Sequence, residues 1–148
     1  MEAAYSTALQ WTTDLSVGCE RLDHRNRALL DALATAENMI TTASSDTLAA
    51  WLQERLDQFA QLLDDEEDEL AAADYPELVF HRLLHDAGRR IALDIHTQLR
   101  HCTSHVALVK LLRSSATSLS LWFMRHVLDV DPFFAPYVDV RYATYQAT

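Results

Sequence analysis

Apolar residues recur every three or four positions along four long segments of this chain, which is the spacing of one face of a helix. The segments are residues 20–40, a stretch from the Ser45–Asp46 pair to Ala73, a stretch that follows Asp74, and a stretch from the Thr103–Ser104 pair to Asp131. The chain holds only 2 Gly and 3 Pro among 148 residues, which is too few for the many turns of an all-β fold. The sequence therefore predicts an all-α protein.

Polar residues suited to helix ends separate these segments. The Ser45–Asp46 pair and the Thr103–Ser104 pair offer short oxygen-bearing side chains, which accept hydrogen bonds from the first turn of a helix. Asp74, with Glu77 three residues later, has the form of a capping box for the third helix. Four amphipathic helices joined by turns this short predict an antiparallel up-down four-helix bundle.

A chain of 148 residues has the length of a single domain, which we expect to span residues 1–148. Hydrophobic residues make up 49% of it, enough to form a core. Residues 1–19 have no regular period and are expected to form an extended N-terminal arm, with Trp11 held against the domain. Residues 132–148 form an aromatic C-terminal tail. We expect this tail to pack over the end of the bundle, with a contact between two copies of the chain as the alternative.

The charge of the chain narrows the classes of partner. A formal net charge of −10 repels a nucleic-acid backbone and an anionic membrane, so neither is an expected partner. No stretch has the form of a signal peptide or of a membrane-spanning helix. Cys19 and Cys102 show no paired spacing and are expected to be reduced thiols. These features predict a cytoplasmic location, and the oligomeric state stays open.

Several polar residues interrupt the apolar stripes near helix ends that an up-down bundle brings together. They are Glu66 near the end of the second helix, His81 and His85 near the start of the third, His126 near the end of the fourth, and Asp131 just beyond it. Buried carboxylates and imidazoles are costly without partners, and a divalent ion would satisfy all five. The pattern predicts a metal site, because di-metal bundles place inward Glu and His residues on facing helices in this way.

The same residues also allow plainer interpretations. His81 and His85 could lie on a solvated face, and His126 could be a core histidine bonded to a backbone carbonyl. Glu66 sits in an acidic run whose other members are expected to be solvated: Asp64, Asp65, Glu67 and Asp68. The remaining histidines are expected at the surface: His24, His96, His101 and His105. A metal site is favoured only because five such residues are expected to meet at one end of the bundle: Glu66, His81, His85, His126 and Asp131.

Four short motifs resemble those of the bacterial hemerythrins, the non-haem di-iron proteins with a four-helix-bundle fold. The similarity spans residues 11–137. The motifs are W-x5-V-G-x3-L-D from Trp11 to Asp23, E-E at Glu66-Glu67, Y-P-x4-H-x3-H from Tyr75 to His85, and W-x3-H-x4-D from Trp122 to Asp131. The resemblance implies iron as the metal, with His81, His85 and His126 as the histidine ligands of one iron. Glu66 and Asp131 match the two carboxylates that bridge the two irons in the family, and the resemblance implies that both are metal ligands here.

Two positions depart from the hemerythrin pattern. Asn26 occupies the position of a histidine ligand in the first helix, and Leu62 occupies the position of a histidine in the second. In the family these two histidines hold the second iron, where dioxygen binds. The resemblance therefore implies a site that holds one metal, with the residues for reversible oxygen carriage missing.

The function expected from these residues is a role in handling or sensing a metal, a redox change or a small gas. Three imidazoles with one or two carboxylates suit iron, manganese or zinc. The possible ligands besides the metal are O2, another diatomic molecule or a small anion. The alternatives are a degenerate di-iron protein that still binds O2, a mononuclear iron or manganese enzyme acting on superoxide or peroxide, and an interaction module stabilised by metal. A chain with two metals is a further alternative, with the second metal bound through the Asn26 oxygen, through His24 after a shift in register, or through nearby carboxylates such as Asp23 or Glu69.

Overall fold

The structure is a computed structural model, and it describes residues 10–138. This part of the chain is all-helical and contains no strand, which confirms the predicted all-α class. Its elements in chain order are the 3-10 helix η1 (Thr13–Leu15), the helices α1 (Glu20–Leu33), α2 (Ala36–Thr42), α3 (Ser45–Ala72), α4 (Leu78–His101) and α5 (His105–Asp129), and the 3-10 helix η2 (Asp131–Phe133). No helix in residues 10–138 is long and apolar enough to cross a membrane.

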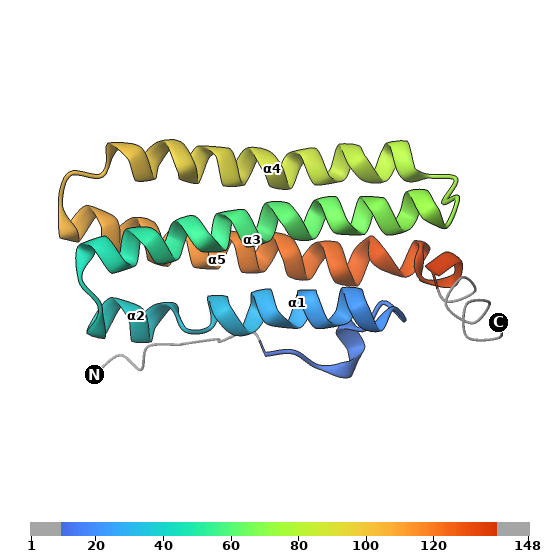
Figure 1. Cartoon of the computed structure of the whole chain (residues 1–148), viewed down its shortest axis with the longest axis horizontal. Coiled ribbons are helices and arrows are strands. Elements are labelled where there is room, and N and C mark those ends of the chain that lie inside the picture. Colours follow the sequence, from blue (N-terminus) through green and yellow to red (C-terminus); the bar gives the residue numbers. More distant parts are fainter. Residues whose placement is uncertain (1–9, 139–148) are drawn as a thin grey trace.

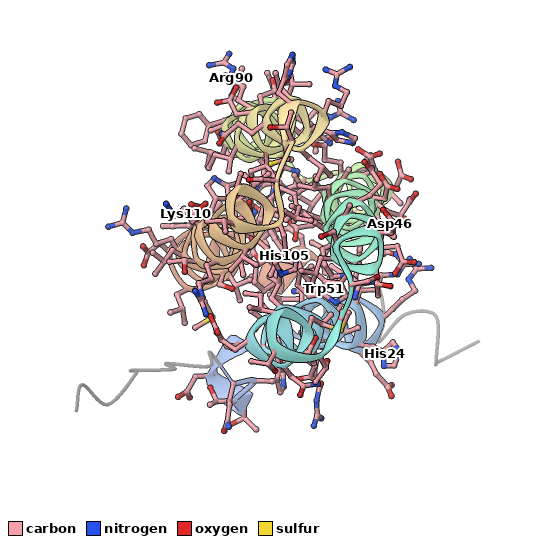
Figure 2. The ribbon with its side chains drawn as sticks, turned by 90° about the vertical axis from the view of Figure 1, so that its left-hand side faces the viewer. His24, Asp46, Trp51, Arg90, His105 and Lys110 are labelled. Atoms are coloured by element: carbon pink, nitrogen blue, oxygen red, sulfur yellow. The ribbon has the colours of Figure 1, made fainter. Side chains whose placement is uncertain are left out.

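The long helices lie side by side along one axis, and the chain reverses direction between them (Figure 1). Seen from one end, α4 lies at the top, α3 and α5 lie on either side, and α1 with α2 lies at the bottom (Figure 2). Helix α3 contacts α1, α4 and α5, and α4 also contacts α5. The last turns of α3 and α5 therefore meet the first turns of α1 and α4 at one end of the molecule, on the right in Figure 1.

The segment predicted as one helix over residues 20–40 is broken in the structure. Helix α1 ends at Leu33, and α2 starts at Ala36. At the break the Thr35 hydroxyl donates to the carbonyl of Ala32 over 2.7 Å, and the Thr35 amide donates to the same carbonyl. This i to i−3 bonding tightens the turn and ends the α-helical pattern. The side chain of Ala36 is still buried, so the apolar stripe continues across the break.

The cap of α3 lies one residue earlier than predicted. The side chain of Ser44 accepts a hydrogen bond from the amide of Thr47, whereas Ser45 is the first helical residue. The Ser45 hydroxyl lies 2.7 Å from Nδ1 of His105 and thus links α3 to α5. The predicted cap of α5 is confirmed at Ser104, which accepts a hydrogen bond from Ala107 over 3.1 Å.

Asp74 ends α3 and does not cap α4, so the predicted capping box is wrong. Asp74 has a φ of 52°, which is the left-handed conformation common just after a helix. Its amide donates to the carbonyl of Ala71, and the amide of Tyr75 donates to the carbonyl of Leu70. This pair of bonds is the Schellman motif that satisfies the last carbonyls of a helix. Helix α4 begins only at Leu78, and Glu77 before it makes no side-chain cap.

The core follows the predicted stripes on α1, α3 and α4. Every predicted stripe residue of α3 is buried, from Leu52 to Leu70. On α5 the helical spacing back from Phe123 predicts Val109 and Ala116 on the buried face, but the pattern is shifted at the start. Leu108 and Ser115 are buried there, and Val109 and Ala116 are only half-buried. In each of these two pairs of neighbours, both residues lie at the edge of the buried face of α5, so the spacing alone does not decide which one is buried.

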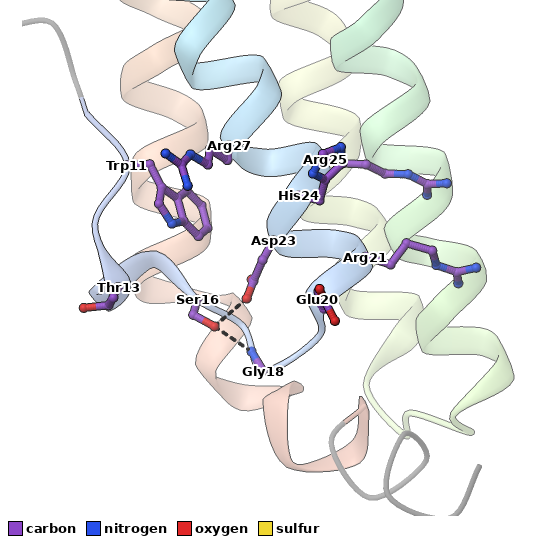
Figure 3. Close-up of a pocket in the computed structure, with 10 residues that line it drawn as sticks. All are labelled: Trp11, Thr13, Ser16, Gly18, Glu20, Arg21, Asp23, His24, Arg25 and Arg27. Carbon is purple, nitrogen blue, oxygen red and sulfur yellow. Dashed lines mark hydrogen bonds between the residues drawn. The ribbon is translucent and has the colours of Figure 1, made fainter. Parts of the chain in front are cut away.

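Residues 10–19 contact α5 through η1 and α1 through Asp23, and they are only partly extended. Leu15 of η1, Val17 and Cys19 are buried in the core. The Asp23 carboxylate accepts a hydrogen bond from the Ser16 hydroxyl (Figure 3). It also accepts one from the Val17 amide, and the two bonds fix the turn at Gly18. Gly18 itself has a φ of 76°. Trp11 is half-buried against the core, as expected.

The start of the aromatic tail covers the end of the bundle, as predicted for residues 132–138. Phe134 and Val138 are buried, and the ring of Phe134 meets the ring of Tyr75 edge-on at 6.3 Å. The expectations for residues 1–9 and 139–148 lie outside the described residues. Cys19 and Cys102 are both free thiols.

Gly88 permits the closest approach between α4 and α5. A Cβ atom at Gly88 would lie 2.7 Å from Cζ2 of Trp122, so a side chain there must push the indole aside. We expect Gly88→Ala to lower the free energy of unfolding by about 1–3 kcal/mol, as overpacking in a core does.

Urea denaturation of Gly88→Ala, Trp122→Phe and the double variant tests this expectation. The phenyl ring lacks the atoms that a Cβ at Gly88 would meet, so the loss in the double variant should be smaller than the sum of the two single losses. A fully additive double variant would show that the contact is not strained.

Candidate metal centre

Three helices bring the predicted polar residues to the same end of the molecule. Glu66 lies in the last two turns of α3, His81 and His85 lie in the first two turns of α4, and His126 lies in the last turn of α5. All four side chains are at most 4% exposed. The alternative in which His81 and His85 lie on a solvated face is therefore wrong.

The four side chains converge on one point. Oε1 of Glu66 lies 2.6 Å from Nε2 of His81, 3.0 Å from Nε2 of His85 and 3.1 Å from Nε2 of His126. Nε2 of His85 also lies 3.0 Å from Nε2 of His126. One ligand atom from each residue lies within 4.8 Å of all the others. The predicted convergence of these four residues is confirmed.

The contact between Nε2 of His85 and Oε1 of Glu66 is not a favourable hydrogen bond. Nδ1 of His85 lies 2.8 Å from Oε1 of Glu67, and an ionised carboxylate only accepts, so Nδ1 carries the proton. In the neutral ring Nε2 then presents a lone pair toward the Glu66 oxygen, which also presents lone pairs. A cation between them would turn this repulsion into attraction. Three imidazole nitrogens and one carboxylate oxygen are suitable donors for Fe(II), Mn(II) or Zn(II).

The charges of the cluster are strongly perturbed. Burial opposes ionisation of Glu66, but the hydrogen bonds of His126 and His81 outweigh it and hold the pKa of Glu66 well below its usual range. Burial also opposes protonation of His126, but Asp131 and Glu66 outweigh it and raise the pKa of His126 to about 10. Burial lowers the pKa of His81. The cluster thus combines one ionised carboxylate with imidazoles of different basicity.

Asp131 lies beside the cluster, in η2. Its Oδ1 is 3.0 Å from Nε2 of His126, and its side chain is fully buried. Neither of its carboxylate oxygens accepts a well-oriented hydrogen bond from residues 10–138. Burial and the charge of Glu66 raise the pKa of Asp131 to about 7. Asp131 is thus adjacent to His126, and its assignment as a metal ligand stays a prediction.

The two altered positions lie on the buried faces of α1 and α3. Asn26 and Leu62 are both buried, and the amide of Asn26 has no hydrogen-bond partner among residues 10–138. Arg21 pairs with Glu69, and Arg25 lies 2.7 Å from Asp65.

These two ion pairs show which residues of α1 and α3 lie at the same level along the bundle. Residue numbers rise along α1 as they fall along α3, so Asn26 lies level with residue 64. Its inward side chain is thus placed between the levels of Leu62 and Glu66, and both of these side chains are buried on α3.

Glu67 is not the solvated residue that the sequence suggested. Its carboxylate bonds to Nδ1 of His85 and accepts a 2.8 Å hydrogen bond from Arg89. Arg89 in turn reaches Asp64 over 2.6 Å. Burial opposes ionisation, but Arg89 and His85 outweigh it and keep the pKa of Glu67 below its usual range. Asp64 and Asp68 are exposed as expected, whereas Asp65 is half-buried beside Arg25.

Aromatic rings pack against the imidazoles, a role that the sequence did not predict for them. The indole of Trp122 stacks on His126, with 4.8 Å between ring centroids and 11° between planes. Phe134 meets His81 edge-on at 5.4 Å, and Tyr75 meets His81 in the same way. Trp122 lies four residues before His126 and so on the same helix face, which was a usable signal for this contact.

The other histidines lie away from the cluster, as expected. His24, His101 and His105 are exposed. In Figure 2 His24 points outward from the bundle, and His105 is seen at the end opposite the cluster. His96 is half-buried, and its Nε2 lies 2.8 Å from Nε2 of Gln53.

Comparison with known proteins does not assign the chain to a family. No protein-family model matches the chain, and no curated protein matches it. The functional conclusions therefore depend on the residues and distances of the chain itself.

Metal binding at this cluster is expected to release a proton. Because the pKa of His126 is raised to about 10, its ring is protonated at lower pH, and a metal ion that binds Nε2 must displace that proton. Between about pH 7, the pKa of Asp131, and about pH 10, the affinity should therefore rise about tenfold per pH unit, and then level off.

Calorimetric titration with Zn(II) at about pH 8, in buffers of different ionisation enthalpy, counts the protons released. We expect close to one proton per metal. Equal heats in all buffers would contradict a protonated His126.

Proposed function

We propose that this chain is a metal-binding protein in which Glu66, His81, His85 and His126 hold one divalent ion. The convergence of three imidazole Nε2 atoms on one buried carboxylate oxygen carries this proposal. A buried group of this composition is stable only when a cation or protons balance its lone pairs. Asp131 beside His126 is proposed as a further carboxylate ligand, and a metal that accepts five ligands would use it.

We further propose that the fold is an antiparallel up-down bundle of the hemerythrin type. The motif residues His81 and His126 belong to the cluster, and the motif residues Tyr75, Trp122 and Asp131 contact these histidines, which supports this relationship. The bundle would count α1 with α2 as its first helix and α3, α4 and α5 as the other three. The iron implied by the resemblance is then the first metal to test, with manganese and zinc as alternatives.

The proposed role is the handling or sensing of a metal, a redox change or a small gas, and not reversible oxygen carriage. The reason lies at Asn26 and Leu62, which supply an amide and an alkyl group where a second metal would need imidazoles. An alkyl group cannot ligate a metal, so a second ion beside Glu66 would lack nitrogen ligands on this side.

Metal content of the purified protein tests the proposed site directly. The parent chain, expressed in iron-rich medium, is expected to carry one metal per chain. His81→Ala and His85→Ala should each lower this content sharply, because each removes a ligand. His96→Ala and His101→Ala are matched controls on the same helix and should leave it unchanged. Equal metal content in all four variants would refute the site.

The altered positions provide a second test. Asn26→His together with Leu62→His is expected to raise the content to two metals per chain, because both positions are buried beside Glu66. Without metal, each new ring costs roughly 1–3 kcal/mol if it stays unpaired, and bound metal offsets this cost.

Metal analysis and visible absorption of the iron-loaded double variant measure the outcome. We expect an absorption band of an oxo-bridged iron pair that the parent lacks. A parent chain that already holds two neighbouring metals would overturn the one-metal proposal.

A further inference from the structure

The carboxylate of Glu67 joins the cluster to the surface of the α3–α4 pair. One of its oxygens, Oε1, lies 2.8 Å from Nδ1 of His85 and also 2.8 Å from the guanidinium of Arg89. His85 is fully buried, whereas the side chain of Glu67 is 14% exposed and that of Arg89 is 31% exposed. A continuous chain of polar contacts thus runs from the buried imidazole to solvent.

His85 differs from the other two histidines in this respect. Among residues 10–138, it is the only one of the three whose Nδ1 lies beside a carboxylate. The contact settles which ring nitrogen carries the proton, because a carboxylate accepts and does not donate. Nε2, which faces Glu66 and His126, is then free to give its lone pair to a metal ion.

We propose that Glu67, held in place by Arg89, is the positioning residue that fixes His85 in the Nδ1–H form and orients its Nε2 toward the cluster. This inference rests on the proposed metal site and extends it to residues outside the ligand set. Carboxylates that bond the second nitrogen of a metal-binding histidine fix its tautomer and raise its basicity, and their loss typically lowers metal affinity 10- to 100-fold.

Arg89 has a separate part in this arrangement. Its guanidinium also reaches Asp64 over 2.6 Å and Asp86 over 3.4 Å. The acidic residues on both helices hold the guanidinium against Oε1 of Glu67, while Nε of Arg82 lies 3.4 Å from Oε2, the other oxygen of this carboxylate. Arg89 thus acts on His85 through Glu67 and has no contact with the cluster itself.

The first experiment reads the tautomer without any metal. Long-range 1H–15N NMR of the metal-free protein, with histidine labelled, reports which ring nitrogen of His85 is protonated. We expect the Nδ1–H form in the parent and in Asp68→Asn, which makes the same charge change at an exposed neighbour. Glu67→Ala should shift His85 toward the Nε2–H form. An unchanged His85 spectrum in Glu67→Ala would overturn the proposal.

The second experiment measures Zn(II) affinity by competition with a chelator. Glu67→Ala is expected to bind Zn(II) about 10- to 100-fold more weakly than the parent, with the same stoichiometry at saturation. Glu67→Gln should lose less, since its amide oxygen still accepts from Nδ1. Arg89→Met should also weaken binding, whereas Arg90→Met, an exposed neighbour, should not.

The Co(II) absorption spectrum separates positioning from a general effect on folding. A ligand field change in Glu67→Gln, with no change in Asp68→Asn, is expected from altered His85 basicity. A lower melting temperature with an unchanged Co(II) spectrum would show that Glu67 only supports the fold and would overturn the proposal.

The two proposals fail in distinguishable ways. A parent chain that binds no Zn(II) refutes the metal site, and the tautomer experiment then still decides whether Glu67 fixes His85. A parent chain that binds Zn(II) as tightly as Glu67→Ala refutes only the role of Glu67.

Discussion

The burial of the Glu66 carboxylate is the constraint on which this end of the molecule depends. A buried ionised carboxylate is costly unless hydrogen bonds or cations balance it, and the bundle supplies three imidazoles within 3.1 Å of one of its oxygens. Each imidazole must be held in turn, and so Trp122 stacks on His126 while Phe134 closes over His81. Gly88 is required because the indole leaves no room for a side chain.

The sequence predicted the residues of the cluster because they recur at the spacing of three or four residues that places side chains on one helix face. Glu66, His81, His85 and His126 each replace an apolar residue on a buried stripe, and a polar residue in such a position needs a buried partner. Glu67 was assigned to the solvent instead, because it lies one position away from the stripe in an acidic run. Its role depends on the reach of its side chain across to α4, and on Arg89, which the period of either helix alone does not reveal.

Helix ends were harder to predict than helix faces, for a local reason. Residues 44–46 read Ser-Ser-Asp, and all three types cap helices well, so tertiary contacts decided among them: Ser45 faces His105 and Ser44 became the cap. Asp74 was ambiguous in the same way, since aspartate suits both a helix start and the left-handed position after a helix end. The break at Thr35 depends on one side-chain hydrogen bond, which no periodic pattern indicates.

The Schellman turn at Asp74 has a consequence for the order in which the cluster can assemble during folding. It joins α3 to α4 so tightly that Glu66 contacts His81 and His85 across only 15 and 19 residues of chain. His126 reaches the same oxygen across 60 residues, and closing the longer loop costs more conformational entropy. Contacts close in sequence form faster than distant ones. The helical hairpin of α3 and α4 is therefore a self-contained half-site, and the docking of α5 is the step that completes it.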